Sequence, residues 1–472
     1  MGRHEELSKL HSHLGAVRAG NSRLVVIRGR RQVGKSRLIT EFVRQADVPQ
    51  LFATGSLQST VRADLGLLAA EVGRSSTLPG RDLLASNPPA TWDGALRLIA
   101  AALPSDGPAI VVLDEFPWFV RRDPGLEGAL QVIWDQVFED KQVLLILVGS
   151  DMAMMEALSN YGRPLYGRTK ELTVRPFNAA DTATMLSHVS DAGDALDFQL
   201  VTGGFPRLVA DATPYDTARQ FVHAELRDDN SSLCVNAMRV LDAELPSGSQ
   251  ADPVLRAIGS GERTFRNIAH TSGLADQPVQ RALATMIEKD LVTRDLPTSV
   301  PSAEHPRYRI ADSYLRLWLA LIGPGISDIQ RGRSDLAVDR FNRSWTSWRG
   351  RAVEPLVREA LARIAVDDAR LGNAAHVSGW WPRNNNPEVD LVGVDRATHP
   401  TSISFVGSIK WRENAPFGHE DLQKLRAAQN TVPGADATTP LVAVARQKVD
   451  VEGVVAYNAR DIVAAWGRHY VG

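Results

Sequence analysis

The chain contains little cysteine and almost no net charge. Cys234 is the only cysteine among 472 residues, which excludes an intramolecular disulfide framework and a multi-cysteine zinc site and favours a reducing compartment. We expect it to be a small buried hydrophobe. The 53 basic and 55 acidic residues give a formal net charge of −2, so the composition as a whole does not favour nucleic acid or an anionic membrane as a partner. Either partner would require a local basic patch.

Long apolar runs are also missing. The longest ones are far shorter than a membrane-spanning helix, and the N-terminus is charged where a signal peptide needs an apolar core. We therefore expect a cytoplasmic protein that does not insert into a membrane. Because 44% of the residues are hydrophobic, a chain of this length can bury the cores of roughly two to four domains.

Apolar runs of strand length alternate with helical patterns over residues 1–180. Residues 24–27, 110–113 and 143–148 are continuous runs of β-branched residues and leucine, which are typical of buried parallel strands. Over residues 181–245 the apolar spacing becomes helical, with a Gly-Gly-Phe-Pro break inside it. These patterns predict an α/β core followed by a small helical lid.

A segment rich in proline, serine and glycine, residues 245–250, predicts a linker after the lid. Beyond it, residues 253–325 show three short helical segments and then a strand pair, the layout of a winged helix-turn-helix. Residues 340–472 return to a helix followed by strands, which predicts a further α/β module. The predicted fold class is therefore multidomain α/β.

A phosphate-binding loop follows the first predicted strand. The residues that fit G-x-x-x-x-G-K-[ST] are Gly29, Arg30, Arg31, Gln32, Val33, Gly34, Lys35 and Ser36, with Arg37 next on the following helix. The glycines let backbone N–H groups surround phosphates, and the helix N-terminus adds its positive end. Lys35 would reach the β and γ oxygens, and Ser36 would bind Mg²⁺.

Two acidic residues end the predicted strand at 110–113. Asp114 and Glu115 stand at its carboxyl end, where ligands of α/β folds bind. An isolated acid pair after a strand is usually a solvated turn. Beside a phosphate-binding loop, however, Asp114 is a candidate to hold hydrated Mg²⁺ and Glu115 to polarise the attacking water.

These motifs together resemble the archaeal-type AAA ATPases, within the broader class of signal-transducing NTPases. Residues 2–7 resemble the G-R-x-x-E-L box of that family, which packs near the adenine, and Ser150 follows a strand that resembles the sensor strand. The resemblance covers roughly the first 240 residues and implies a P-loop NTPase core that binds ATP and Mg²⁺. It also implies that Ser150 reads the γ-phosphate.

Two arginines become candidates through the same resemblance. Residues 164–168 resemble a P-L-Y-G-R segment, in which Arg168 would be an arginine finger acting in cis or on a neighbouring subunit of an oligomer. Residues 203–206 resemble the G-G-x-P turn of the lid, and Arg207 follows it. Since the chain is rich in arginine, a surface or ion-pair role is the alternative for each.

The third helical segment of residues 253–325 is a candidate DNA-reading helix. It would expose Gln277, Gln280 and Arg281, which are residue types that contact base edges and phosphates. Eight basic and seven acidic residues lie between 253 and 312, an excess too small to establish a DNA footprint. Packing within an ATPase is the alternative role of such a module.

The C-terminal module carries a candidate metal site. Asp390 lies on the predicted strand 389–394 and Lys410 at the end of the predicted strand 403–409, an arrangement seen in Mg²⁺-dependent phosphodiesterases. Glu354, on the predicted helix 351–365, is either a partner of the helix dipole or a metal-facing carboxylate.

This module resembles the PD-(D/E)XK restriction-endonuclease-like domains that are fused to such ATPases. The resemblance assigns Asp390 and Lys410 to the motif and Glu354 to the helix acid. Ser408 stands where the second acid of the motif is expected, which should weaken metal binding. Glu388, Glu413 or Glu420 are the possible replacements. We therefore expect an impaired nuclease-like domain that still binds nucleic acid or a protein.

Three functions are consistent with this sequence. The first is an Mg²⁺-dependent ATPase whose nucleotide state acts on a winged helix and a nuclease-like domain, with DNA as the expected partner. The second is a nucleotide-switched interaction protein whose partner is a protein. The third is an ATP-regulated nuclease, which requires a replacement for the acid missing at Ser408.

Overall fold

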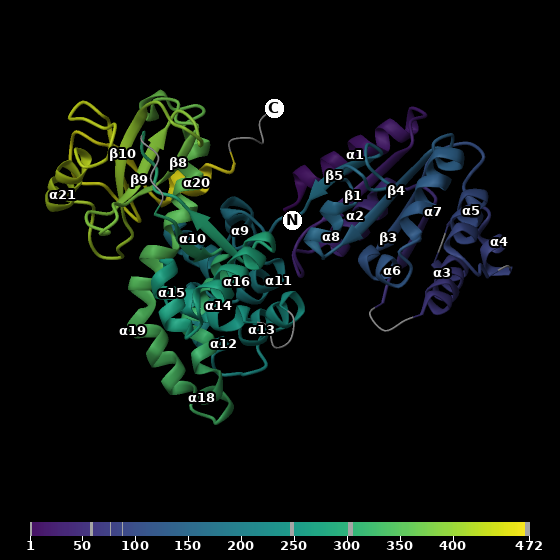
Figure 1. Ribbon diagram of the computed structural model, residues 1–472, viewed down its shortest axis with the longest axis horizontal. Coiled ribbons are helices and arrows are strands. Elements are labelled where there is room, and N and C mark those ends of the chain that lie inside the picture. The colour runs from purple at the N-terminus through teal and green to yellow at the C-terminus, as the bar shows by residue number, and fades with distance from the viewer. Residues whose placement is uncertain are drawn as a thin grey trace. The chain divides into compact units, whose positions relative to one another are not determined.

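The computed structural model describes residues 2–56, 60–75, 77–86, 88–245, 250–300 and 305–467. The chain forms two compact units, residues 1–176 and 177–472 (Figure 1). Most of the predicted linker, residues 246–249, lies outside the described residues. In the described part of the chain, no helix is both long and apolar enough to span a membrane.

The first unit is built on a five-stranded parallel sheet in the order β2-β3-β4-β1-β5. Every residue of β3 and β4 is buried, as expected for parallel strands covered on both faces. The three predicted runs form the central strands β1, β3 and β4, whereas the edge strands β2 and β5 were not predicted. The strands are β1 (Arg23–Arg28), β2 (Gln50–Thr54), β3 (Ala109–Asp114), β4 (Val143–Gly149) and β5 (Thr169–Thr173).

Helices cover this sheet. On one face, apolar side chains of α3, α5 and α7 share a single core with β3 and β4, in which Trp92 and Phe119 pack edge to face with ring centroids 4.9 Å apart. Helices α1 and α2 contact each other, and α1 contacts β1 and β4. The helices are α1 (His4–Arg18), α2 (Lys35–Ala46), α3 (Val61–Ser75), α4 (Arg81–Ser86), α5 (Trp92–Ala102), α6 (Phe116–Arg122), α7 (Leu126–Ile133), the π-helical η1 (Trp134–Phe138) and α8 (Met152–Ala157).

The second unit begins with five helices where the lid was predicted. They are α9 (Ala179–Met185), α10 (Ala192–Thr202), α11 (Pro206–Ala212), α12 (Ala218–Glu225) and α13 (Ser232–Glu244). The predicted break separates α10 from α11, because Gly203 and Gly204 adopt left-handed backbone conformations with φ of 61° and 69°. A Cβ on Gly204 would lie 2.0 Å from the carbonyl oxygen of Phe177, so only glycine fits there.

Cys234 lies on α13 with 1% of its surface exposed. Burial raises the pKa of its thiol to about 11, so the thiol stays protonated at neutral pH. Its position agrees with the expected role of a small buried hydrophobe.

Three helices and an antiparallel strand pair follow, in the predicted order. They are α14 (Ala251–Gly259), α15 (Phe265–Ser272), α16 (Asp276–Glu288), β6 (Val292–Asp295) and β7 (Arg307–Ile310). The next helical elements are α17 (Ser313–Leu317), η2 (Trp318–Ile322), η3 (Gly323–Gly325), α18 (Ile326–Gln330), α19 (Ser334–Ala352) and α20 (Glu354–Ile364). The predicted helix 351–365 is thus α20, which begins directly after α19 ends.

The chain ends in a second five-stranded sheet in the order β12-β11-β10-β9-β8. Strands β8, β9 and β10 are antiparallel neighbours, and β10, β11 and β12 are parallel. Helix α20 contacts β8 and β9, and Leu422 and Leu425 of α21 share a core with Val392 and Val406. The elements are η4 (Ala369–Leu371), β8 (His376–Trp380), β9 (Val389–Val394), β10 (Ile403–Lys410), α21 (His419–Gln429), β11 (Leu441–Ala445), β12 (Val455–Tyr457) and α22 (Ala459–Ala464).

A buried polar network ties the lid helix α10 to α19 and to the C-terminal sheet. The carboxylate of Asp197, on α10, accepts hydrogen bonds from Arg349 at 2.9 Å, Arg446 at 3.2 Å and the indole of Trp411 at 3.4 Å. Asp197 is 4% exposed, and Arg349 is 1% exposed. Buried charges persist only when they are paired in this way. The network therefore fixes α10 against the C-terminal part of the chain.

We predict that Asp197→Ala destabilises the second unit by about 3–5 kcal/mol, because it leaves two arginine charges buried without their shared carboxylate. Urea denaturation followed by tryptophan fluorescence measures the loss. Asp191→Asn is the matched control, because asparagine can still accept from the N–H of Asp194 and cap α10. The Asp191 carboxylate is 3.6 Å from Arg446 but 52% exposed, so losing its charge should cost less than about 1 kcal/mol. Equal losses for the two variants would contradict this assignment.

Candidate functional site

The phosphate-binding loop connects β1 to α2 in the first unit. Gln32 and Gly34 have φ of 67° and 86°, which turns the backbone tightly just before Lys35 begins α2. A Cβ on Gly29 would lie 2.3 Å from the carbonyl oxygen of Val174, so this glycine allows β1 and the chain after β5 to approach closely. The loop thus ends at the N-terminus of a 12-residue helix, which favours an anion.

Lys35 turns back over this loop. Its side chain is 7% exposed, and its Nζ donates hydrogen bonds to the carbonyl oxygens of Gly29 at 2.8 Å and Arg30 at 3.0 Å. The ammonium group therefore lies within the curl of the loop. The neighbouring Arg31 is half-buried, and Arg37 is exposed on the first turn of α2.

Four predicted residues from three elements are joined by hydrogen bonds. The hydroxyl of Ser36 donates to Oδ2 of Asp114 at 2.8 Å, and the backbone N–H of Glu115 donates to Oδ1 of Asp114 at 2.9 Å. The hydroxyl of Ser150 donates to Oε2 of Glu115 at 3.1 Å. Glu115 has φ of 52°, an uncommon conformation for a side-chain-bearing residue and one that clusters at functional sites.

The order of the strands explains this convergence. Strand β4 lies between β1 and β3, and all three are parallel, so the loop after β1, the acid pair at the end of β3 and Ser150 after β4 reach the same sheet edge. The hydroxyl of Ser36 and the carboxylate of Asp114 are oxygen donors of the kind that Mg²⁺ prefers. The residues at this edge therefore fit a magnesium ion.

The N-terminal box also contacts the loop. Arg3 donates to the carbonyl oxygen of Val33 at 2.7 Å and to Oε1 of Glu6 at 2.8 Å. Residue 3 was part of a motif in the sequence, but the motif alone did not indicate a bond to the phosphate-binding loop. Arg3 therefore braces the loop from the start of the chain.

The candidate arginines have other partners. Arg168 forms a two-point ion pair with Asp135, through Nε at 2.6 Å and Nη2 at 2.7 Å, and its Nη1 donates to the carbonyl oxygen of Tyr166. This bond raises the pKa of Arg168 and stabilises its charge. Arg207 lies on α11 in the second unit, is 71% exposed, and donates to Ser232 at 3.2 Å. The finger and lid roles of these arginines stay predictions.

Helix α16 presents the expected polar surface. Val279, Leu283 and Met286 are buried, whereas the side of the helix that carries Gln277, Gln280, Arg281 and Thr285 is exposed. The helix therefore packs through one stripe and leaves polar groups open to solvent, as its apolar periodicity predicted.

The C-terminal site brings together Asp390 and Ser408 on neighbouring strands. Oδ2 of Asp390 accepts hydrogen bonds from the Ser408 hydroxyl at 2.9 Å and the Ile409 N–H at 2.8 Å. Glu354 accepts from Arg358 at 3.2 Å, and Arg358 donates to the backbone oxygen of Asp390 at 2.9 Å. Burial raises the pKa of Glu354. The positive charge of Arg358 lowers this pKa, and the negative charge of Asp390 raises it.

None of the proposed replacement acids joins this site. Glu388 pairs with Arg307, Glu413 pairs with Arg349, and Glu420 pairs with Lys424. Within the described ranges, no group of three histidine, cysteine or acidic side chains is placed to hold a metal ion. Asp390 therefore has Ser408 beside it in place of the second acid that the nuclease resemblance implies, and none of the three candidate acids replaces it.

Comparison with known proteins bears on two segments. Residues 1–130 match a family model described as an AAA ATPase domain. Residues 318–425 match one described as archaea bacterial proteins of unknown function, a description that names no activity. An uncharacterized protein of Methanocaldococcus jannaschii is 22% identical over 430 residues, which cover 87% of each chain.

The chain is also similar to solved structures. The Walker-type ATPase of Pyrococcus abyssi has a TM-score of 0.52 and 20% identity, and the match covers 67% of this chain and 95% of that one. The ORC2 protein of Aeropyrum pernix has a TM-score of 0.45 and 13% identity, and the match covers 72% of this chain and 94% of that one. The family match and the first structure agree with an AAA-type P-loop core in the first unit.

We predict that Ser408→Asp converts the C-terminal site into one that responds to a metal. Without metal, a second carboxylate beside Asp390 should lower the melting temperature through charge repulsion, and Mn²⁺ should restore it by ligating both carboxylates. Differential scanning fluorimetry with EDTA or Mn²⁺ measures the shift. Ser404→Asp, on the same strand but bonded to Gly372, is the control and should show no restoration. A wild-type chain that responds equally to Mn²⁺ would contradict this interpretation.

Proposed function

We propose that the protein is an Mg²⁺-dependent ATPase that couples its nucleotide state to DNA binding by its second unit. The observation that carries the proposal is the hydrogen-bonded set Ser36, Asp114, Glu115 and Ser150 beside a buried Lys35 at one sheet edge. This set provides a phosphate cradle, a cation site and a base in one place, which is what phosphoryl transfer to water requires.

The roles follow from the geometry. Lys35 and the N-terminus of α2 hold the β- and γ-phosphates, and Ser36 with Asp114 would hold Mg²⁺, which neutralises charge on the phosphates. Glu115 orients the attacking water and accepts its proton. Ser150 keeps the Glu115 carboxylate in position through the 3.1 Å hydrogen bond and would sense the γ-phosphate, as the family resemblance implies.

Two variants test the ATPase by separating ATP binding from ATP hydrolysis. Lys35→Ala should abolish binding of a fluorescent ATP analogue, because the positive charge within the loop is lost. Glu115→Gln should still bind ATP but hydrolyse it about 10²–10⁴ times more slowly, since only proton transfer is removed. Phosphate release measures the rate. Lys170→Ala, an exposed lysine on β5, is the control. Normal hydrolysis by Lys35→Ala would refute the proposal.

The DNA contact is assigned to α16 and the β6–β7 pair, which we interpret as a winged helix. Its exposed Gln277, Gln280 and Arg281 lie along one side of a 13-residue helix, the length and chemistry of a helix that enters the major groove. The C-terminal sheet is interpreted as a nuclease-like domain that binds without cutting, because Ser408 occupies the place of the second acid.

We predict that Arg281→Ala weakens binding to duplex DNA and lowers the slope of log K against log salt by about 1, as expected when one phosphate contact is lost. Fluorescence anisotropy at several salt concentrations measures both quantities. Arg256→Ala is the control, because this arginine lies on α14 and pairs with Asp252 at 2.7 Å. If the wild-type chain shows no salt-dependent DNA binding, the DNA assignment fails while the ATPase assignment stands.

The second candidate function is a nucleotide-switched protein-interaction module. Tyr161 and Tyr166 favour it: they are 89% and 49% exposed, and their rings meet edge to face 5.4 Å apart on the loop between α8 and β5. Exposed aromatic residues of this kind are common in protein interfaces. If the anisotropy experiment shows no DNA binding, the protein-interaction function is supported over the DNA-coupled one.

A further inference from the structure

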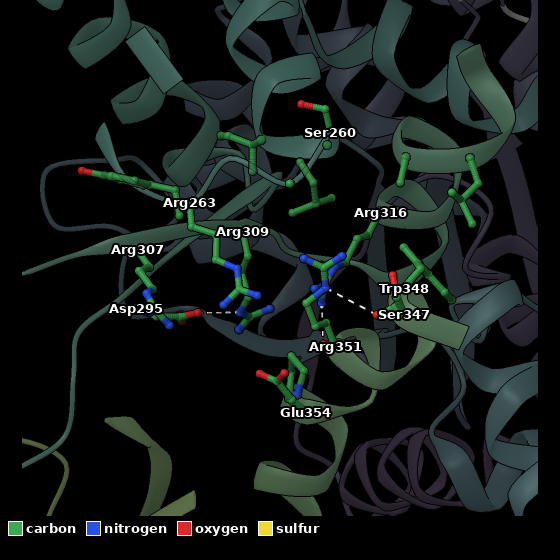
Figure 2. Close-up of a pocket in the computed structure, with 18 of the residues that line it drawn as sticks. Ser260, Arg263, Asp295, Arg307, Arg309, Arg316, Ser347, Trp348, Arg351 and Glu354 are labelled. Carbon is green, nitrogen blue, oxygen red and sulfur yellow. Dashed lines mark hydrogen bonds and ion pairs between the residues drawn. The ribbon is translucent and has the colours of Figure 1, made fainter. Parts of the chain in front are cut away.

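An arginine-rich pocket lies within the second unit, apart from the nucleotide site. Its cavity of about 230 Å³ is enclosed by the end of α14, the β6–β7 pair, η2, the last turns of α19 and the start of α20 (Figure 2). The charged residues that line it are Arg263, Asp295, Arg307, Arg309, Arg316, Arg351, Glu354, Arg358 and Glu388, and we call it the arginine pocket.

The arginine pocket has an excess of positive charge. Six guanidinium groups face three carboxylates, which leaves three positive charges uncompensated when every lining group is ionised. Glu388 is shared by Arg307 at 2.6 Å and Arg263 at 3.1 Å. The other two carboxylates are each occupied by one arginine, Asp295 by Arg309 at 2.7 Å and Glu354 by Arg358 at 3.2 Å.

Two arginines of the pocket bond only to carbonyl oxygens. Nη1 of Arg316 donates to the backbone oxygen of Arg351 at 3.1 Å, and Nε of Arg351 donates to the backbone oxygen of Ser347 at 3.4 Å. Among the residues that the structure describes, no carboxylate lies within ion-pair distance of either guanidinium. Figure 2 shows the guanidinium groups of Arg309, Arg316 and Arg351 directed toward the same space.

The electrostatics of Arg316 reflect this crowding. Burial lowers the pKa of Arg316 to about 10, and the positive charges of Arg309, Arg263 and Arg351 lower it further against the pull of Glu354. Several guanidinium groups that face fewer carboxylates repel one another, and an anion between them would relieve this repulsion. Planar guanidinium groups donate paired hydrogen bonds that match the oxygens of phosphate.

We propose that the arginine pocket binds a phosphoryl group, with Arg316 and Arg351 as its principal donors. The cavity is smaller than the roughly 300–1,000 Å³ of most small-molecule sites, so it admits one phosphoryl group while the rest of a larger ligand stays outside. Two sources share this chemistry: a free phosphate compound and the phosphorylated end of a nucleic-acid strand. The proposal depends on the arrangement of these arginines and not on ATP hydrolysis by the first unit.

The test uses the full chain carrying Lys35→Ala, so that the phosphate-binding loop does not contribute. Titrations with inorganic phosphate and with adenosine monophosphate, followed by calorimetry, probe the free source. Fluorescence anisotropy with a single-stranded oligonucleotide bearing either a 5′-phosphate or a 5′-hydroxyl probes the strand end. Binding in either arm supports the pocket, and the arm that responds identifies the source.

Variants then locate the site. Arg351→Gln should weaken whichever binding is observed by about tenfold or more, because one charge-assisted donor is lost. Arg351 is exposed, so the variant should fold. Arg316→Met is the second variant, and circular dichroism checks that it folds. Arg343→Gln, an exposed arginine two turns earlier on α19 and outside the pocket, should leave the affinity unchanged.

Two results would contradict the proposal. The proposal is overturned if neither phosphate compound binds and the 5′-phosphate confers no advantage over the 5′-hydroxyl. It is also overturned if Arg351→Gln and a folded Arg316→Met both retain the affinity of the parent chain. ATP hydrolysis by Arg351→Gln in the otherwise unaltered chain should stay normal, which separates failure of the pocket from failure of the ATPase.

Discussion

The nucleotide site depends on the placement of β4 between β1 and β3. Because these three strands are parallel neighbours, their carboxyl ends deliver Lys35, the acid pair and Ser150 to one edge, although Lys35 and Ser150 are 115 positions apart in the chain. The positive φ of Glu115 is part of the same arrangement: it turns the chain directly after Asp114, so that the next carboxylate reaches Ser150. The uncommon backbone conformation of Glu115 thus orients its carboxylate toward Ser150.

A different constraint shapes the second unit. Asp197 receives two arginines and an indole from distant parts of the chain, so α10 cannot separate from α19 or the C-terminal sheet without exposing or orphaning buried charge. The predicted lid and the C-terminal module are therefore not independent neighbours. A change of nucleotide state that acted on α10 would act through this network on α19, which also lines the arginine pocket.

The sequence predicted what local patterns can reveal. The strand at 389–394 has the predicted bounds, and the phosphate-binding loop lies between the expected strand and helix. Strand β5 was missed because its residues Thr169–Thr173 are mostly polar, as an edge strand permits. The partner of Arg168 could not be predicted, since Asp135 lies 33 positions away and no periodicity links the two. The arginine pocket was missed for the same reason, because its residues are scattered over 130 positions.

The C-terminal site and the arginine pocket share Glu354 and Arg358. Arg358 pairs with Glu354, donates to the backbone of Asp390 and lines the pocket. An active metal centre of the nuclease type would need Glu354, Asp390 and a second strand acid to face a cation, but Glu354 is held by Arg358 and Ser408 stands where the second acid is expected. The guanidinium groups outnumber the carboxylates that line the arginine pocket, which favours an anion there. The phosphoryl binding that we propose therefore needs only the arginines, whereas cleavage would also need a metal.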